Sequence, residues 1–339
     1  MQTVSLKKGL DLKLKGELPD AAAAASRKIV PAEVAVVPDD FPGLTPRPAV
    51  KPGDAVAAGQ PVITDKNYPE ICLAAPVAGT VADVVRGERR KLLRVVITPE
   101  ANAPEAKAAA VDCSDAESLK KALMNSGLWA MMRQRPYDIV PDPAAVPRDI
   151  FVTAFDSAPL AATLLASPAD AKEALQKGID ALRLLTPGKV YVGIRPDSGF
   201  PELRGAVTVA FSGPHPAGNA GVQIAALAPV NKGETVWTLD AATLCRIGRF
   251  VATGKVDFTA RVAITGSEVA RPEIIDTVEG ADIRSLLDGE IPATPDHNLR
   301  IISGNVLTGT KVGRDGFLRF PYRQITVIPE GDDVDEFMG

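Results

Sequence analysis

Short apolar runs separated by turn residues fill the chain from about residue 30 to 98, a pattern typical of a small β-rich domain. In the stretch "VKPGDAV", Pro52-Gly53 predicts a tight turn between two strands. Pro99 and the alanine-rich stretch 100–110 then interrupt the pattern. Such a segment predicts a linker, so we expect a first domain that ends near residue 100.

Strands and helices alternate in the next region, 112–254, which predicts a mostly parallel sheet covered by helices. The link 195–205 is too rich in proline and glycine to predict a helical crossover. The expected strands are 149–155, 189–194, 206–211 and 235–239. The expected helices begin at a capping box of Ser114 with Glu117, at Ser167-Pro168 and at Asp240, and Gly127 and Gly254 mark two helix ends.

The third region, 255–329, returns to strands and contains one short helical stretch, "ADIRSLLDG" (281–289). A few strands around one helix indicate a small β-grasp-like domain. The stretch 331–339 holds four acidic residues and no core-forming pattern. The sequence therefore predicts a multidomain chain of mixed α/β and β structure.

Composition excludes several classes of function. The net charge of -4 and the pI of about 5.4 argue against a nucleic-acid-binding protein, which would carry a basic surface. Cys72, Cys113 and Cys245 form no C-x-x-C pair, so we expect neither disulfides nor an iron–sulfur cluster. We see no signal peptide and no apolar run near the ~20 residues of a membrane span, so we expect a cytoplasmic protein.

Histidine is rare, which limits metal and hydrolytic chemistry. His215 and His297 have no acidic or cysteine partner at metal-ligand spacing, so the sequence predicts no metal site. No G-x-S-x-G turn accompanies either histidine, which disfavours a serine hydrolase.

Lys66 raises the question of a swinging-arm carrier. A lipoylated or biotinylated lysine stands at the apex of a tight hairpin, and Lys66 follows Asp65 in a comparable place. The residues 67–69, however, widen this turn. We therefore favour an unmodified surface lysine over a carrier lysine.

Three further segments suggest binding sites. In "GLWAMMRQRPYD" (127–138), Trp129 could stack on a quinone or flavin ring beside Arg133 and Arg135, although a buried plug at a domain interface is the favoured interpretation. The glycine-rich stretch 211–224 is either a phosphate or partner site or a tight loop in which His215 packs. Our candidate quinone or partner residues are Trp129, Arg133, Arg135 and His215.

The basic stretch "RGERRKLLR" (86–94) is the third of these segments. It either meets an acidic partner or anionic lipid headgroups, or forms a solvated hairpin, which is the interpretation we favour.

Many motifs occur in the order that is characteristic of one bacterial family. These motifs are "KKGLDLKLKG", "VKPGDAVAAGQPV", "APVAGTV", "RGERRKLLRVVI", "SGLWAMMRQRPYDIVP", "TAFDSAPLAA", "GKVYV", "GPHPAGNAGVQI", "PVNKGETVW" and "RIISGNVLTG". In these segments the chain resembles the NqrA family, the A subunits of the Na+-translocating NADH:quinone reductases.

The resemblance implies a domain plan. A biotinyl/lipoyl-like barrel-sandwich domain would span 1–100. A Rossmann-like α/β domain, related to the flavin subunit of respiratory complex I, would span 101–254, and a β-grasp domain of the SLBB type 255–330. Residues 331–339 would begin a further helical segment, so we expect a truncated chain.

The resemblance also implies a function. The chain would be a peripheral subunit on the cytoplasmic side of the bacterial inner membrane, bound to membrane-embedded subunits and in contact with ubiquinone as a candidate ligand. The complex, a translocase and oxidoreductase, would pass electrons from NADH to ubiquinone and export Na+. Other subunits would hold the flavins and iron centres, so the isolated chain would carry no redox cofactor and would not be catalytic.

The related flavin subunits hold FMN with a "GGAGFP" loop and an E-C-E-P segment. The resemblance aligns 127–138 with the first and 155–159 with the second, so that Trp129 stands in place of a glycine and Ser157 falls in the second motif. It therefore implies a nucleotide-binding fold with a filled pocket. The alternatives are an FMN-dependent subunit of an Rnf-like ferredoxin:NAD oxidoreductase and a carrier modified on Lys66.

Overall fold

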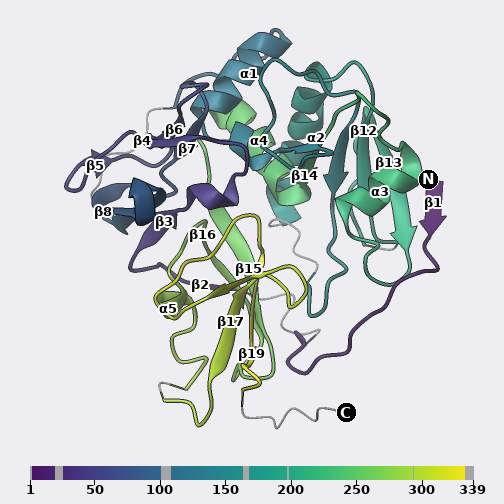
Figure 1. The fold of residues 1–339 in the computed structure, drawn as a ribbon. Coiled ribbons are helices and arrows are strands. Elements are labelled where there is room, and N and C mark those ends of the chain that lie inside the picture. The colour runs from purple at the N-terminus through teal and green to yellow at the C-terminus, as the bar shows by residue number, and fades with distance from the viewer. Residues whose placement is uncertain are drawn as a thin grey trace. The chain divides into compact units, whose positions relative to one another are not determined.

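The computed structural model describes residues 2–19, 26–100, 108–162, 168–196, 198–292 and 294–332. These residues form four β-sheets and divide into two compact units (Figure 1). The first unit holds 1–10, 35–157 and 165–258, and the second holds 11–34, 158–164 and 259–339. Most of the expected linker, Ser167 and most of the acidic stretch 331–339 lie outside the described residues.

Two small sheets make up the β domain that the turn pattern predicts. The larger has the order β3-β9-β8-β5 and the smaller the order β4-β6-β7. Their buried side chains include Val62, Ile63, Val95 and Ile97, which have no accessible surface. The strands are β3 (Val34–Val36), β4 (Pro46–Pro48), β5 (Ala55–Val56), β6 (Pro61–Asp65), β7 (Cys72–Ala74), β8 (Gly79–Arg86) and β9 (Leu92–Pro99).

The turn between β6 and β7 is organised by a buried carboxylate. Asp65 is 3% exposed, and its side chain accepts hydrogen bonds from the backbone amides of Thr45, Asn67 and Tyr68. Lys66 is exposed, and its amide donates to the carbonyl of Thr45. Asp65 therefore stabilises a wide turn, as expected from the residues that follow Lys66.

The α/β sheet confirms the alternating pattern of the second region. Its order is β1-β13-β12-β11-β14-β10, and each neighbouring pair is parallel except β10 with β14. The part of the link 195–205 that is described contains no helix, as its composition predicts. The strands are β1 (Gln2–Ser5), β10 (Arg133–Arg135), β11 (Ile150–Thr153), β12 (Val190–Ile194), β13 (Ala206–Ser212) and β14 (Val236–Asp240).

Four helices accompany this sheet, namely α1 (Ala116–Asn125), α2 (Pro168–Leu184), α3 (Ala220–Leu227) and α4 (Ala241–Thr253). Asp240 caps α4 and Gly254 ends it with a φ of 69°, as predicted. The predicted capping box at Ser114 is wrong. The amide of Ser114 donates to Asp112, and the helix begins one residue later than this box predicted. Asp115 is the N-cap of α1 and accepts from the amide of Ser118 at 2.8 Å.

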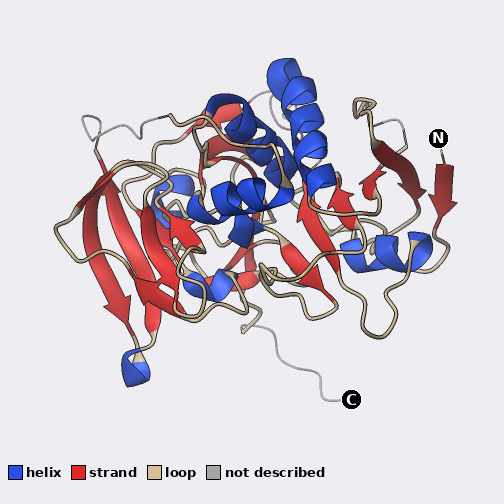
Figure 2. Ribbon diagram, turned by 90° about the horizontal axis from the view of Figure 1, so that it is seen from above, coloured by secondary structure: helices blue, strands red, loops and turns tan. Residues whose placement is uncertain are grey.

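Two glycines allow α2 and α4 to pack closely (Figures 1 and 2). A Cβ atom at Gly248 would lie 1.7 Å from the carbonyl oxygen of Ala174, and one at Gly178 would lie 2.5 Å from that of Leu244. Both distances are far below van der Waals contact. The crossing of the two helices therefore depends on backbone meeting backbone, which only glycine permits.

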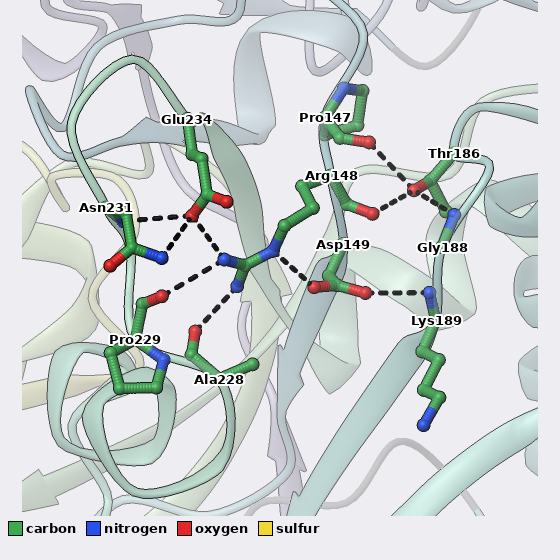
Figure 3. Close-up of polar contacts among 10 residues, drawn as sticks. All are labelled: Pro147, Arg148, Asp149, Thr186, Gly188, Lys189, Ala228, Pro229, Asn231 and Glu234. Carbon is green, nitrogen blue, oxygen red and sulfur yellow. Dashed lines mark hydrogen bonds and ion pairs between the residues drawn. The ribbon is translucent and has the colours of Figure 1, made fainter.

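A polar network around Arg148 joins the amino ends of β11, β12 and β14 (Figure 3). The Arg148 guanidinium donates to Asp149 and Glu234 and to the carbonyls of Ala228 and Pro229. Hydrogen bonds from Asn231, together with Arg148, hold the pKa of Glu234 below its ordinary value. The Arg148 side chain thereby fixes the loop that leads from α3 to β14.

The second unit contains the β-rich domain expected from the third region. Its sheet has the order β18-β17-β19-β15-β16-β2, and Ile264, Ile275, Ile325 and Val327 form its fully buried centre. The elements are β2 (Ser26–Lys28), β15 (Thr259–Thr265), β16 (Glu273–Val278), α5 (Ile283–Leu286), β17 (Leu299–Ser303), β18 (Thr310–Val312) and β19 (Gln324–Pro329).

The first 28 residues supply strands to sheets other than those of the barrel-sandwich domain. β1 pairs in parallel with β13 of the α/β sheet, and β2 pairs in parallel with β16. Both strands fall in the range 1–100, which we expected to form one domain. Their partners are hundreds of residues away, so no local pattern could have revealed the pairing.

The close packing of α2 on α4 gives a direct test of this arrangement. Gly248→Ala should destabilise the protein by about 3 kcal/mol, because the added methyl has no space and overpacked helices must separate. Gly221→Ala is the matched control. No atom lies within 4 Å of a Cβ at Gly221 in α3, so this change should stabilise the protein by about 0.5 kcal/mol.

The measurement is urea unfolding of the three proteins under one set of conditions. Equal effects of the two substitutions would contradict the close approach of α2 and α4.

Candidate functional site

The carboxyl ends of the parallel strands meet at one edge of the α/β sheet. The chain runs from β11 to β12 and β13 on one side and then places β14 on the other side of β11. In open α/β sheets, ligands bind at such a reversal of strand order, outside the carboxyl ends of the strands. The loops after β11, β12, β13 and β14 therefore define the place to look for a site.

Ser157 and His215 meet at this edge. The Ser157 hydroxyl lies 3.0 Å from Nδ1 of His215 and accepts a hydrogen bond from the amide of Gly218 at 2.8 Å. Because the hydroxyl accepts from Gly218, its own proton can be donated to the histidine ring. One half-buried serine thus ties the loop after β11 to the loop after β13.

A second contact joins the same loops. The guanidinium of Arg195, which follows β12, donates to the carbonyl of Gly213 at 2.7 Å and lies 4.9 Å from the centre of the Phe155 ring. Such a stacked cation on an aromatic ring adds to the hydrogen bond. We call Phe155, Ser157, Arg195, His215 and Gly218 the carboxyl-edge cluster.

The amino-terminal segment extends over the loop that carries His215. The amide of Leu6 donates to the carbonyl of Ser212 at 2.9 Å, and the amide of Leu10 donates to that of His215 at 3.0 Å. A Cβ atom at Gly9, whose φ is 146°, would lie 2.1 Å from the His215 carbonyl oxygen. The sequence did not predict this contact, although Gly9 is the residue that permits the close approach to another backbone.

Four backbone amides near this edge donate to acceptors of the chain itself. The amides of Ala217 and Asn219 donate to the carbonyls of Pro214 and Pro216, and the Gly218 amide donates to Ser157. At the start of α4, the carboxylate of Asp240 accepts from the amide of Thr243 at 2.7 Å. In a nucleotide-binding protein, amides of this kind would donate to the oxygens of a phosphate. Here they donate to protein oxygens instead.

Trp129 lies inside the protein. It has no accessible surface, its Nε1 donates to the carbonyl of Pro141 at 2.9 Å, and its ring meets that of Trp237 edge to face at 5.0 Å between centres. Met132 is also fully buried. The aromatic face that could have stacked on a quinone or flavin is therefore packed against protein.

The two arginines of this segment have protein partners as well. Arg133 donates to the carbonyls of Ala130 and Asp40 at 2.9 and 2.6 Å, and burial lowers its pKa. Nε of Arg135 lies 3.3 Å from the carboxylate of Asp138. Tyr137 is 77% exposed at the turn that follows.

The structure separates the four candidate residues into two places. Trp129, Arg133 and Arg135 lie on or beside β10, whereas His215 follows β13. β12, β11 and β14 lie between these two strands in the sheet. At the usual spacing of neighbouring strands, β10 and β13 are roughly 19 Å apart, so the four residues do not form one site.

Cys72 illustrates how the first domain contacts the α/β domain. Its thiol lies 3.3 and 3.2 Å from the carbonyl oxygens of Met124 and Asn125 at the end of α1. Burial raises the pKa of this thiol to about 12. Cys72 is therefore a packing residue rather than a nucleophile, since the thiolate is the reactive form.

Within the described part of the chain, no group of three or more histidine, cysteine or acidic side chains is arranged to hold a metal ion. His297 instead lies 3.1 Å from the carboxylate of Glu268. The same residues include no helix that is both long and apolar enough to cross a bilayer.

Comparison with known proteins matches all three parts of the chain to one family. The model of the NqrA N-terminal barrel-sandwich hybrid domain matches residues 4–100. The NqrA second alpha/beta domain matches 114–256, and the NQRA C-terminal domain matches 261–314. The fold is thus that of a three-domain NqrA-type protein.

Curated relatives agree along nearly the whole chain. The A subunit of the Na(+)-translocating NADH-quinone reductase of Rhodopirellula baltica is 38% identical over 98% of this chain and 74% of its own length. Those of Marinomonas sp. and Pseudomonas aeruginosa are each 37% identical, over 96% and 97% of this chain and 73% and 74% of theirs. The chain belongs to the NqrA family, the A subunits of the Na(+)-translocating NADH-quinone reductases.

The role of Ser157 can be tested by removing its hydroxyl. Ser157→Ala should destabilise the protein by about 1–2 kcal/mol, because the Gly218 amide and the His215 ring both lose the hydrogen bond to this hydroxyl. The control is Ser114→Ala, an exposed hydroxyl beside α1, which should change stability by less than about 0.5 kcal/mol.

Thermal unfolding followed by circular dichroism compares these variants with the unchanged protein. If Ser157→Ala and Ser114→Ala unfold at the same temperature, the carboxyl edge does not depend on this hydroxyl.

Proposed function

We propose that this chain acts as the NqrA component of a Na+-translocating NADH:quinone reductase, a translocase and oxidoreductase of the respiratory chain that passes electrons from NADH to quinone and exports Na+. The observation that carries the proposal is the family relationship, which extends over 98% of the chain at 38% identity. The matches to all three NqrA domain models support it independently of any single motif.

The chain contributes to this enzyme in a structural role, without a redox cofactor of its own. Two features of the α/β domain support this role. The amides of Ala217, Gly218, Asn219 and Thr243 donate to protein oxygens. Trp129 and Met132 fill the segment that the resemblance aligns with the FMN loop. The residues present therefore do not fit a bound flavin, which other subunits would supply together with the iron centres.

The strand order supports a more distant relationship as well. The succession β13-β12-β11-β14 corresponds to the strand order 3-2-1-4 of a dinucleotide-binding sheet. We propose that the domain descends from a Rossmann-like flavin domain of the complex I type and that its pocket has since closed. The proposed domain bounds are 1–100, 101–254 and 255–330, the last a β-grasp domain of the SLBB type.

The partners are the other subunits of the enzyme, above all those embedded in the membrane. The chain lies peripherally on the cytoplasmic side of the inner membrane, which is compatible with its helices, none of which among the described residues spans a bilayer. Ubiquinone stays a candidate ligand of this subunit, although Trp129 is packed against protein and lies three strands away from the strand that precedes His215.

Neither alternative function gains support. An Rnf-like, FMN-dependent subunit is not supported, because the matching family models and curated relatives are those of NqrA proteins. A carrier modified on Lys66 would need a tight hairpin apex, whereas Asp65 stabilises a wide turn at this point.

The test is deletion of the gene for this chain in its source bacterium, followed by complementation. Membranes of the deletion strain should lose the Na+-stimulated reduction of quinone by NADH, and the intact gene should restore it. Unchanged Na+-stimulated activity in the deletion strain would contradict the proposed function.

Two glycine variants sharpen this experiment. Gly221→Ala should restore activity fully, because its Cβ meets no other atom. Gly9→Val should restore little, because its side chain would collide with the backbone of His215. Western blots of the membranes report how much of each variant remains attached.

A further inference from the structure

The tip of the hairpin formed by β8 and β9 concentrates positive charge on an acidic protein. The nine residues 86–94 include five basic side chains and one acidic one, in a chain of net charge -4. Arg86, Arg89, Arg90 and Lys91 are exposed. Lys91 pairs with Asp39 at 2.7 Å, whereas none of the ion pairs among the described residues uses Arg89 or Arg90.

The backbone of this tip is unusual for its sequence. The amide of Lys91 donates to the carbonyl of Glu88 at 3.1 Å, which closes a turn whose central residues are Arg89, with φ 51° and ψ 27°, and Arg90, with φ 61°. Left-handed values at both central positions define a type I′ turn, for which Asn-Gly is the preferred pair. Arginine is a poor choice for either position, because its Cβ crowds the backbone there.

Arg86 strengthens the same turn and keeps its charge at the tip. Its guanidinium donates to the carbonyl of Arg90 at 3.1 Å, and the Gly87 amide donates to the carbonyl of Lys91 at 2.9 Å. The hairpin therefore presents three guanidinium groups on a fixed turn. Because the turn itself would be better served by Asn-Gly, the two central arginines indicate a requirement for charge at this point.

The side chains of the tip also indicate the kind of partner. Leu92 is buried and Leu93 packs against Gly87. All exposed side chains of 86–91 are charged. Protein–protein contacts usually have an apolar centre, which this tip does not offer. Binding to anionic lipid headgroups needs no such centre, since it is built from the additive attraction of basic residues to a charged membrane surface.

We propose that the β8–β9 tip is a contact site for anionic phospholipid headgroups, in which Arg86, Arg89 and Arg90 bind the phosphates of the membrane surface. The inference rests on the proposed function, because a peripheral subunit of a membrane enzyme is the setting in which such a surface is within reach. The contact adds an electrostatic anchor to whatever contacts the chain makes with its protein partners.

The experiment uses co-sedimentation of the full chain with lipid vesicles. The variant Arg89→Asn together with Arg90→Gly supplies the preferred type I′ pair, so it should fold at least as stably as the unchanged protein. The control, Arg47→Gln with Lys51→Gln, removes the same charge from exposed residues elsewhere in the same domain. Thermal unfolding verifies that all three proteins are folded.

We expect the unchanged chain to bind vesicles of phosphatidylcholine with about one quarter phosphatidylglycerol at about 50 mM NaCl, and to be released at about 500 mM NaCl. The tip variant should bind roughly thirtyfold more weakly, about fivefold for each arginine. The control variant should change binding by less than about threefold, because it alters only the long-range field.

Three outcomes would overturn the proposal: equal binding of the chain to neutral and anionic vesicles, full binding by the tip variant, or equal losses in the tip and control variants. If the unchanged chain ignores vesicles but the tip variant fails to co-purify with the other subunits, the partner is an acidic protein surface and the lipid assignment is wrong.

Failure of the proposed function gives a different result. It would show as unaltered Na+-stimulated quinone reduction in the deletion strain, whatever the vesicles report.

Discussion

The hydroxyl of Ser157 joins the elements on which the α/β domain depends. It accepts from Gly218 and meets His215, so it connects the end of β11 with the loop that leads into α3. The amino-terminal segment then bonds to that same loop through Leu6 and Leu10. At the opposite edge of the sheet, Arg148 fixes the amino ends of three strands (Figure 3). Both edges of a fold that commonly binds nucleotides are thus held by contacts within the protein.

These contacts give the segments that resemble a flavin-binding protein a different use. A glycine loop can offer its amides to a phosphate, but the amide of Gly218 and those of its neighbours donate to side-chain or backbone oxygens. Trp129 and Trp237 pack edge to face inside the protein. The same sequence features that suggest a ligand site are thereby explained as packing within the α/β domain.

Much of the architecture could be predicted from the sequence because it rests on local patterns. Apolar strands alternating with helices predicted the parallel sheet, and Asp240 and Gly254 marked both ends of α4. Contacts between distant segments could not be predicted. The residues around Gln2 and Arg27 carry no pattern that predicts pairing with β13 or β16. The residues around Trp129 likewise do not predict that three strands separate this segment from the strand before His215. The motif with Ser114 failed because Asp115, one residue later, offered the better cap.

We propose that the carboxyl edge of the α/β sheet is held by contacts within the chain and binds no flavin. Mass spectrometry of the purified chain incubated with FMN, once under native and once under denaturing conditions, tests this claim most directly. We predict the mass of the bare polypeptide in both spectra. An added mass of flavin size that is present in the native spectrum and lost on denaturation would contradict the account and show that the edge opens to a nucleotide.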